Sequence, residues 1–268
     1  MATVLKVKNL KTHFKLRTGT LKAVDGLSFE VEPGRVLCIV GESGSGKSVT
    51  AQSIMRLIEL PGRIVDGSIQ YRDQDLLTLS EKEMEKLRGN RIGMIFQDPM
   101  TSLNPVFTIG EQIAETIVAH QGVKKNEART RAVELLRLVG IPEPEGRVND
   151  YPHQFSGGMR QRVLIAIAIA CEPDLLIADE HTTSLDVTIQ AQILKLLADV
   201  QKKLHSAMIL ITHDLGVVSA MADEVLVMYS GRMVEFGDVE TIFRHPRHPY
   251  TVGLLESIIK LDDTRDSE

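Results

Sequence analysis

Residues 36–48 have the sequence VLCIVGESGSGKS, which joins two different local patterns. Val36–Val40 are five consecutive apolar residues, a pattern typical of a short strand buried on both faces. The next eight residues contain three glycines, and Lys47 and Ser48 follow the last of them. A helical pattern then continues to about Leu60, before Pro61 and Gly62. The stretch therefore predicts a buried strand, a tight glycine-rich loop and a helix that begins at the end of the loop.

The spacing Gly41-x4-Gly46-Lys47-Ser48 is that of a phosphate-binding loop. Glycines allow backbone N–H groups to turn inward around phosphate oxygens, and the helix that follows adds its positive end. The lysine would bridge the outer phosphates of a nucleotide, and the Ser48 hydroxyl would bind Mg²⁺. A plain glycine- and serine-rich connector is the alternative, but connectors seldom place Lys-Ser at a helix start. The candidate nucleotide-binding residues are Gly41, Glu42, Ser43, Gly44, Ser45, Gly46, Lys47, Ser48 and Val49.

A second apolar strand, Leu175–Ala178, ends in two acidic residues, Asp179 and Glu180. In a nucleotide site of this kind, Asp179 would hold Mg²⁺ and Glu180 would orient or deprotonate the attacking water. Taken alone, two acids after a strand are more often a solvated strand end or a helix cap. The phosphate-binding loop makes the catalytic interpretation the stronger one.

The remaining pattern predicts an α/β fold, because short strands alternate with helices after residue 170. Residues 1–35 contain short alternating segments, which we interpret as an N-terminal antiparallel β-subdomain. Between about 98 and 160 the sequence has no strong strand signal, and Ile109, Ile113 and Ile117 recur at helical spacing. We therefore predict a P-loop core with a mostly parallel sheet covered by helices, and a helical subdomain inserted at about 98–160. The cassette would span residues 1–236, and residues 237–268 would form a C-terminal tail.

Composition excludes several classes of protein. The formal net charge is −5, from 31 Lys and Arg against 36 Asp and Glu, which argues against binding nucleic acid by bulk charge. The longest apolar run, Val163–Cys171, falls short of the roughly 20 residues that a membrane helix needs. The two cysteines, Cys38 and Cys171, lie in apolar stretches and suggest small buried side chains in a reducing compartment.

A further segment narrows the class of nucleotide-binding protein to which the chain can belong. Residues 155–162 have the sequence FSGGMRQR, in which Ser156, Gly157 and Gly158 open a long apolar helix. Glycine disfavours helix interiors, so two glycines here suit a helix N-terminus that must approach a phosphate closely. The segment resembles the signature sequence of ATP-binding-cassette (ABC) ATPases. The other motifs of that family follow its order: Gln97 after an apolar strand, Ser184-Leu185-Asp186, and His213 after Met208–Thr212.

The resemblance implies that two cassettes pack head to tail, with each ATP between one P-loop and the partner's Ser156, Gly157 and Gly158. It implies ATP and Mg²⁺ as cofactors, with Ser48, Gln97 and Asp179 around the metal. Glu180, His213, Gln97 and Lys47 would act in hydrolysis, with Glu180 as the base and His213 at the γ-phosphate. Asp186 belongs to the loop that the family calls the D-loop.

Two segments resemble a particular branch of the family, the ATPases of importers for dipeptides, oligopeptides and nickel. They are Gln97–Pro105 and His245–Thr251, and the details around Val49 and Met159 resemble the "D" rather than the "F" cassette of such importers. The resemblance implies a second, homologous cassette, most simply in a heterodimer, and two transmembrane permease subunits. It also implies an indirect link to a substrate-binding protein and a peripheral position on the cytoplasmic face of the inner membrane.

Several alternatives stay open from the sequence. Phe14 is the candidate for stacking on adenine, and a core phenylalanine is an equal alternative. His181 stands where the family nearly always has proline, either as a tolerated substitution or as a titratable ring beside Glu180. The alternative function is a soluble ABC ATPase that acts on DNA, ribosomes or an assembly pathway. A P-loop kinase or GTPase would leave Ser156-Gly157-Gly158 unexplained.

Overall fold

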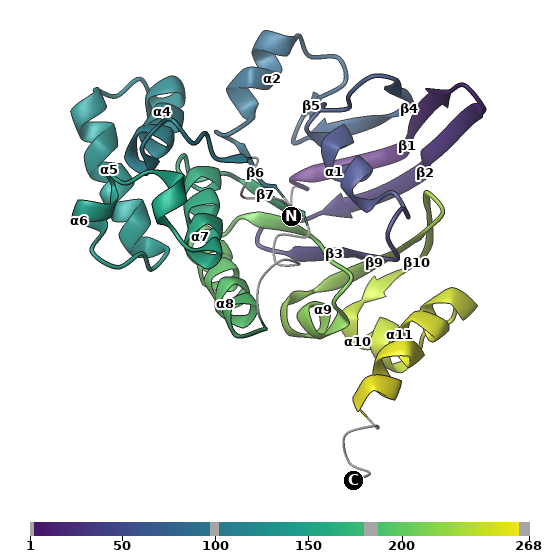
Figure 1. Ribbon diagram of the computed structural model, residues 1–268. Helices are drawn as coiled ribbons and strands as arrows, with labels where there is room; N and C mark the ends of the chain where they lie inside the picture. The colour runs from purple at the N-terminus through teal and green to yellow at the C-terminus, as the bar shows by residue number, and fades with distance from the viewer. Residues whose placement is uncertain (1–2, 97–101, 180–186, 263–268) are drawn as a thin grey trace. The chain divides into compact units, whose positions relative to one another are not determined.

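The computed structural model describes residues 3–96, 102–179 and 187–262. The chain forms two compact units, one of residues 1–79 with 207–268 and the other of residues 80–206 (Figure 1). The first unit contains the phosphate-binding loop, and the second contains the segment with Ser156–Gly158 and the strand that ends in Asp179.

The first unit contains a four-stranded antiparallel sheet in the order β2-β1-β4-β5. Its long strands are β1 (Leu5–Leu16), β2 (Gly19–Val31) and β4 (Gly62–Tyr71), and β5 (Gln74–Asp75) is a short edge strand. Leu5 and Val7 of β1 are fully or almost fully buried, and so are Leu10 and Thr12 beyond the register shift after Val7, which is the pattern of a sheet with one face in a core. This confirms the antiparallel β-subdomain that the sequence predicted.

The same unit contains a second group of strands, in the order β10-β9-β3-β8. The strand β3 (Val36–Val40) is parallel to both β8 (Ala207–Ile211) and β9 (Glu224–Tyr229), and β10 (Arg232–Asp238) is antiparallel to β9. All five residues of β3 and of β8 are buried, as expected of central parallel strands. Because β3 and β8 run in the same direction, the loops after them emerge at the same end of these strands.

Four helices complete the described part of the first unit. The helix α1 (Lys47–Ile54) follows the glycine-rich loop, and α9 (Leu215–Met221) follows β8. The helices α10 (Val239–Arg244) and α11 (Pro249–Asp262) come after β10. The prediction that the first helix continues to about Leu60 is wrong, because the backbone turns at Arg56, whose φ is 52°. The Arg56 guanidinium holds this turn through the carbonyls of Leu76 and Leu79.

The second unit contains two parallel strands, β6 (Ile92–Ile95) and β7 (Leu175–Asp179), paired so that Ile95 lies opposite Ala178. Its helices are α2 (Glu81–Leu87), α4 (Ile109–Gln121), α5 (Lys125–Leu138), α6 (Pro144–Arg147), α7 (Gly157–Ala168) and α8 (Val187–Leu204), with a 3₁₀ turn at Pro152–Gln154. The buried residues of α4 include Ile109, Ile113 and Ile117, the three that the sequence placed on one face. Between residues 102 and 160 the structure shows helices and turns, without a strand.

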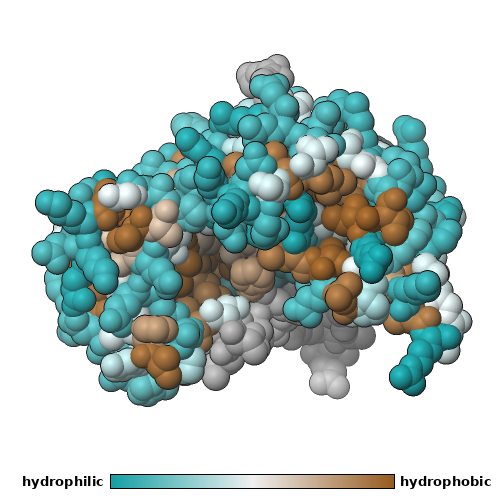
Figure 2. All heavy atoms as spheres, turned by 90° about the horizontal axis from the view of Figure 1, so that it is seen from above, coloured by the Kyte–Doolittle hydropathy of each residue, from teal (hydrophilic) through white to brown (hydrophobic). Residues whose placement is uncertain are grey.

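The face of the molecule that Figure 2 shows is mostly hydrophilic, with hydrophobic side chains exposed in several places. The more exposed hydrophobic side chains of the first unit include Leu16, Leu21, Leu60 and Val65, which lie in or next to β1, β2 and β4. Among the described residues, no helix is both long enough and apolar enough to cross a membrane.

Candidate nucleotide-binding site

The glycine-rich loop connects β3 to α1 and passes very close to two other backbone segments. A Cβ atom on Gly41 would lie 2.2 Å from the carbonyl oxygen of Met228, and one on Gly46 would lie 2.2 Å from that of Ala23. Both glycines have positive φ, +148° and +105°. Any side chain at either position would therefore combine a steric clash with a strained backbone. The two glycines of the motif are required by the packing of the loop as well as by its shape.

Lys47 lies at the first position of α1 and is only 4% exposed. Its Nζ donates hydrogen bonds to the carbonyl oxygens of Gly41 (2.8 Å) and Glu42 (2.9 Å). The ammonium group is thus held inside the curve of the loop, in contact with the loop's own acceptors. A buried ammonium needs acceptors, and phosphate oxygens entering the loop would offer stronger, charge-assisted ones.

Ser45 shows that the loop suits a ligand rich in acceptors. Its carbonyl oxygen accepts a hydrogen bond from the N–H of Gly231 (2.9 Å), but its buried hydroxyl has no hydrogen-bond partner. A buried hydroxyl without a partner is unfavourable, so the position fits a ligand group that accepts a hydrogen bond from it. Next to it, the place where Gly44 would carry a Cβ has no heavy atom within 4 Å, so the loop is open at this point. These features fit the phosphates of a nucleotide.

Ser48 and Val49 belong to the first turn of α1, and both are half-buried. The helix is anchored further along by two buried hydroxyls. Thr50 donates to the carbonyl of Gly46 (2.9 Å), and Ser53 contacts Thr12 of β1 at 2.8 Å between the two hydroxyl oxygens. The first turn of α1, which carries the predicted Mg²⁺ ligand Ser48, is therefore fixed to the loop and to the antiparallel sheet.

His213 follows β8, whose residue Ile211 lies opposite Ile39 of β3. The parallel register brings the loop after β8 to the same end as the phosphate-binding loop. Its flanks are fixed, because Thr212 Oγ1 accepts the N–H of Asp214 (3.0 Å), and the Asp214 carboxylate caps α9 through Gly216 (2.8 Å) and Val217 (3.3 Å). His213 itself is exposed. Of the predicted site residues, the first unit thus brings together Gly41–Val49 and His213 at one end of its parallel strands.

Phe14 lies on β1 and is half-buried. A Cβ atom on Gly62 would lie 2.6 Å from its ring, so one edge of the ring packs tightly against the start of β4. This contact accounts for part of its burial, and the adenine contact stays a prediction.

In the second unit, Asp179 is the last residue of β7 and is 5% exposed. Because carboxylates are seldom this deeply buried, Asp179 is better explained as part of a ligand site than as a solvated strand end. The predicted residues Gln97, Glu180 and Asp186 lie outside the described residues, as does His181.

The segment Ser156–Gly158 begins α7. Ser156 caps the helix, and its Oγ accepts the N–H of Met159 (3.3 Å). Gly158 is buried, and a Cβ there would lie 2.8 Å from Ile189 of α8, whereas Ser156 and Gly157 are exposed. The second glycine thus serves helix packing, and the exposed Ser156 and Gly157 leave the positive end of α7 accessible to an anion.

Sequence reasoning missed two residues that contact the phosphate-binding loop. The N–H of Gly231, in the turn between β9 and β10, donates to Ser45, and the Tyr250 hydroxyl of α11 accepts the N–H of Glu42 (3.0 Å). The sequence singled out the segment around Tyr250 only for its family resemblance. No local signal in the sequence connects either residue to the loop, because each lies roughly 200 positions away from the loop along the chain.

Comparison with known proteins places this geometry in a family. The family model described as "ABC transporter" matches residues 24–183, which include the phosphate-binding loop, Ser156–Gly158 and Asp179. The chain belongs to the ABC transporter family. A second family model, described as "Oligopeptide/dipeptide transporter, C-terminal region", matches residues 234–268.

Similar curated proteins support the same assignment. The chain is 58% identical to the oligopeptide transport ATP-binding protein OppD of Bacillus subtilis (strain 168), over 99% of this chain and 74% of that protein. It is 54% identical to the dipeptide transport ATP-binding protein DppD of Escherichia coli (strain K12), over 95% of this chain and 78% of that protein. Among solved structures, the dimeric ATP-binding cassette MJ0796 in a post-hydrolysis state with ADP and Pi covers 88% of this chain, with 27% identity and a TM-score of 0.78.

The ABC ATPase thus has the fold that its sequence predicted, and the prediction of ATP binding and hydrolysis is confirmed. The predicted importer function is also confirmed at the level of the family, and the comparisons do not support the soluble alternative.

Proposed function

We propose that this ABC ATPase is the energy-supplying subunit of an importer for peptides or a related small solute. The match of residues 234–268 to the peptide-transporter region and the names of its relatives support this cargo class. The main evidence for the nucleotide site is that the buried Lys47 ammonium is held within the loop, where the Ser45 hydroxyl has no hydrogen-bond acceptor.

In the proposed site, the amides of residues 41–48 surround the phosphates of ATP. Lys47 exchanges its carbonyl acceptors for oxygens of the β- and γ-phosphates, and the Ser45 hydroxyl gains an acceptor. For Lys47, each exchange replaces a neutral acceptor by an anionic one, which strengthens the hydrogen bond. Phe14 is the proposed contact of the adenine ring.

The donor set also suits Mg²⁺, a hard cation that takes oxygen ligands and is commonly bound by one or two carboxylates together with substrate phosphates. We assign it to the Ser48 hydroxyl, the Asp179 carboxylate and the Gln97 side chain. Bound there, it would neutralise charge on the phosphates during transfer. Glu180 is the proposed base, which takes a proton from the attacking water, and His213 the proposed contact of the γ-phosphate.

The proposed partners begin with a second, homologous cassette, in a heterodimer. Ser156, Gly157 and Gly158 of one cassette would contact the nucleotide on the P-loop of the other, with Asp186 near the shared interface. The exposed N-terminus of α7 supports this role, because its positive end favours an anion.

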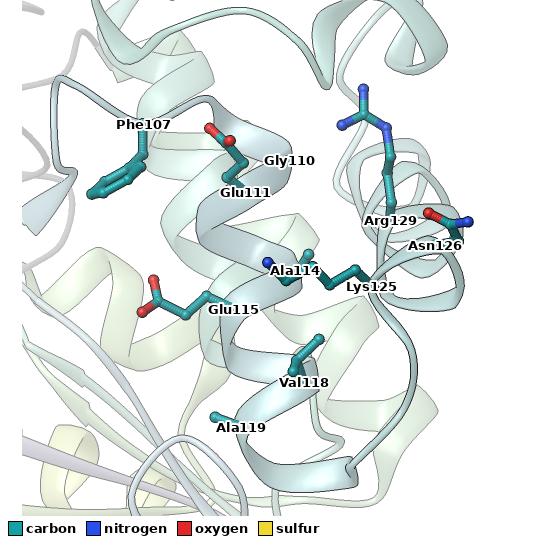
Figure 3. A pocket seen from close by; sticks show the side chains of 10 residues that line it. All are labelled: Phe107, Gly110, Glu111, Ala114, Glu115, Val118, Ala119, Lys125, Asn126 and Arg129. Carbon is teal, nitrogen blue, oxygen red and sulfur yellow. The ribbon is translucent and has the colours of Figure 1, made fainter.

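Two transmembrane permease subunits are the other proposed partners, and the complex would work at the cytoplasmic face of the cell membrane. The helical part of the second unit offers a surface for them, a groove of about 580 Å³ between α4 and α5 (Figure 3). Ala114, Val118 and Ala119 form its apolar part, and charged side chains of both signs border it, among them Glu111, Glu115, Lys125 and Arg129. Such a surface suits an amphipathic helix.

Trapping the nucleotide-bound pair tests the proposal. Glu180→Gln, mixed with the second cassette and saturating ATP-Mg, should form a stable dimer in size-exclusion chromatography with light scattering, because the base is removed while binding is retained. The same protein with Lys47→Ala added should stay monomeric. A Glu180→Gln protein that stays monomeric under these conditions would contradict the scheme.

The permease surface is tested separately. Ala114→Glu should reduce co-purification with the permeases and leave the ATPase activity of the isolated cassettes unchanged. Retained co-purification would remove the groove from the proposed interface.

A further inference from the structure

The segment His245–Thr251 is fixed rigidly to the strand β10. The Glu235 carboxylate of β10 uses both oxygens to accept backbone N–H groups of this segment, from Arg247 (2.7 Å) and from His248 (3.1 Å). His248 in turn accepts the N–H of Tyr250 on its Nδ1 (3.2 Å), at the start of α11. The backbone that carries Tyr250 is therefore held by side-chain contacts on both sides of Pro249.

The ring of Tyr250 is also fixed. It packs against Tyr229 at the end of β9, with 4.6 Å between the ring centroids and 46° between the planes. Tilted aromatic pairs at this distance are favourable. The hydroxyl is therefore presented to the phosphate-binding loop from a side chain with little freedom to move.

The hydroxyl contacts one particular peptide group of that loop. The N–H of Glu42 donates to Tyr250 Oη at 3.0 Å, and the carbonyl of the same peptide group, that of Gly41, accepts Lys47 Nζ at 2.8 Å. One flat peptide group is thus held at both ends, by the loop lysine at its oxygen and by Tyr250 at its nitrogen. Burial raises the pKa of Tyr250, so the neutral hydroxyl persists across the physiological range.

We propose that Tyr250 is a positioning residue for ATP binding, which fixes the Gly41–Glu42 peptide group and through it the Lys47 ammonium. The inference rests on the proposed nucleotide site. Gly41 is the reason that such a contact is needed, because a glycine has no Cβ and restricts the orientation of the following peptide group less than any other residue would. When only a fraction of molecules holds the competent orientation, the apparent dissociation constant rises by the inverse of that fraction.

The test uses Tyr250→Phe, which removes the hydroxyl and keeps the ring pair. Loss of one neutral hydrogen bond predicts that the Kd for ATP rises by about three- to tenfold. The turnover rate at saturating ATP should stay within about twofold, because ATP itself restores the orientation of the loop. Hydrogen exchange measured by NMR should become faster at the Glu42 amide, which reports the loss of the hydrogen bond. A rise in Kd without a matching fall in turnover is the effect that a merely structural role would not produce.

Tyr229→Phe is the matched control, since it removes a hydroxyl from the other ring of the pair, and it should leave Kd and the Glu42 amide unchanged. Glu235→Gln weakens the anchor of the segment and should raise Kd in the same direction by less. This second variant serves as the test should Tyr250→Phe lower the melting temperature strongly.

Two results can be told apart. An unchanged Kd for ATP in Tyr250→Phe would overturn the inference, even with faster exchange at the Glu42 amide, while leaving the nucleotide site intact. Full ATP affinity in Lys47→Ala would instead overturn the proposed site itself.

Discussion

The turn at Gly231 offers a measurable test of how the phosphate-binding loop is supported. Gly231 has φ +79°, its N–H donates to Ser45, and its carbonyl accepts the N–H of Asp25 (2.8 Å). A Cβ there would lie 2.7 Å from the carbonyl oxygen of Lys22 and 2.9 Å from that of Ala23. Gly231→Ala therefore strains the backbone and also pushes the turn between β9 and β10 away from Lys22 and Ala23 of β2.

The magnitude can be estimated from these two effects. A left-handed conformation costs a residue with a Cβ about 1–2 kcal/mol, and forcing packed groups apart adds about 1–3 kcal/mol. Gly231→Ala should therefore lower the free energy of unfolding by about 2–5 kcal/mol. Gly34→Ala is the matched control, because Gly34 has a similar φ of +71° but no heavy atom within 4 Å of its Cβ position. It should lose only about 1–2 kcal/mol.

Urea unfolding followed by circular dichroism measures both losses, and a fluorescent ATP analogue measures Kd. Gly231→Ala should also weaken nucleotide binding, because its amide supports Ser45, whereas Gly34→Ala should not. Equal losses of stability in the two variants would refute the steric argument. Unchanged nucleotide affinity in Gly231→Ala would refute the link between the turn and the loop.

Three further predictions concern other parts of the first unit. Ser53 donates its proton to the carbonyl of Val49 (2.6 Å), so Thr12 must be the donor in its hydrogen bond with Ser53. Ser53→Ala should therefore lower the free energy of unfolding in urea by about 1–3 kcal/mol, and Thr12→Val by only about 1 kcal/mol. A larger loss in Thr12→Val would contradict this direction of donation. Burial raises the pKa of the Cys38 thiol, so native protein at pH 8 should not react with a thiol reagent at Cys38 until urea unfolds it; rapid native labelling would refute this. Burial also raises the pKa of Glu224, so the charged carboxylate is unfavourable in the folded protein. Glu224→Gln should therefore raise the melting temperature at pH 8, where the carboxylate is charged, and change it little at pH 3, where it is protonated. An equal change of melting temperature at both pH values would rule out charge as the cause.

The parts of the fold that the sequence predicted well are those with a local cause. Val36–Val40 is wholly apolar and forms a strand buried along its length. Ser80 and Glu83, three positions apart as in a capping box, form that box at the start of α2. Prediction from the sequence failed where contacts between distant residues decide the secondary structure. The strand β4 went unpredicted because its residues are mixed in character, and pairing with β1 makes them a strand.

The phosphate-binding loop itself could be found from the sequence, because its shape depends on consecutive residues: glycines free to turn, then Lys47 and Ser48 at a helix start. Its support could not be found in this way. Gly231 and Tyr250 reach the loop because β9 lies beside β3 in the sheet, so that the ends of both strands and the start of α11 meet at one place. Strand order depends on the packing of the whole core, and short sequence patterns carry no record of it. The sequence alone thus determined the nucleotide chemistry of this ABC ATPase, and the tertiary structure decided which distant residues hold that chemistry in position.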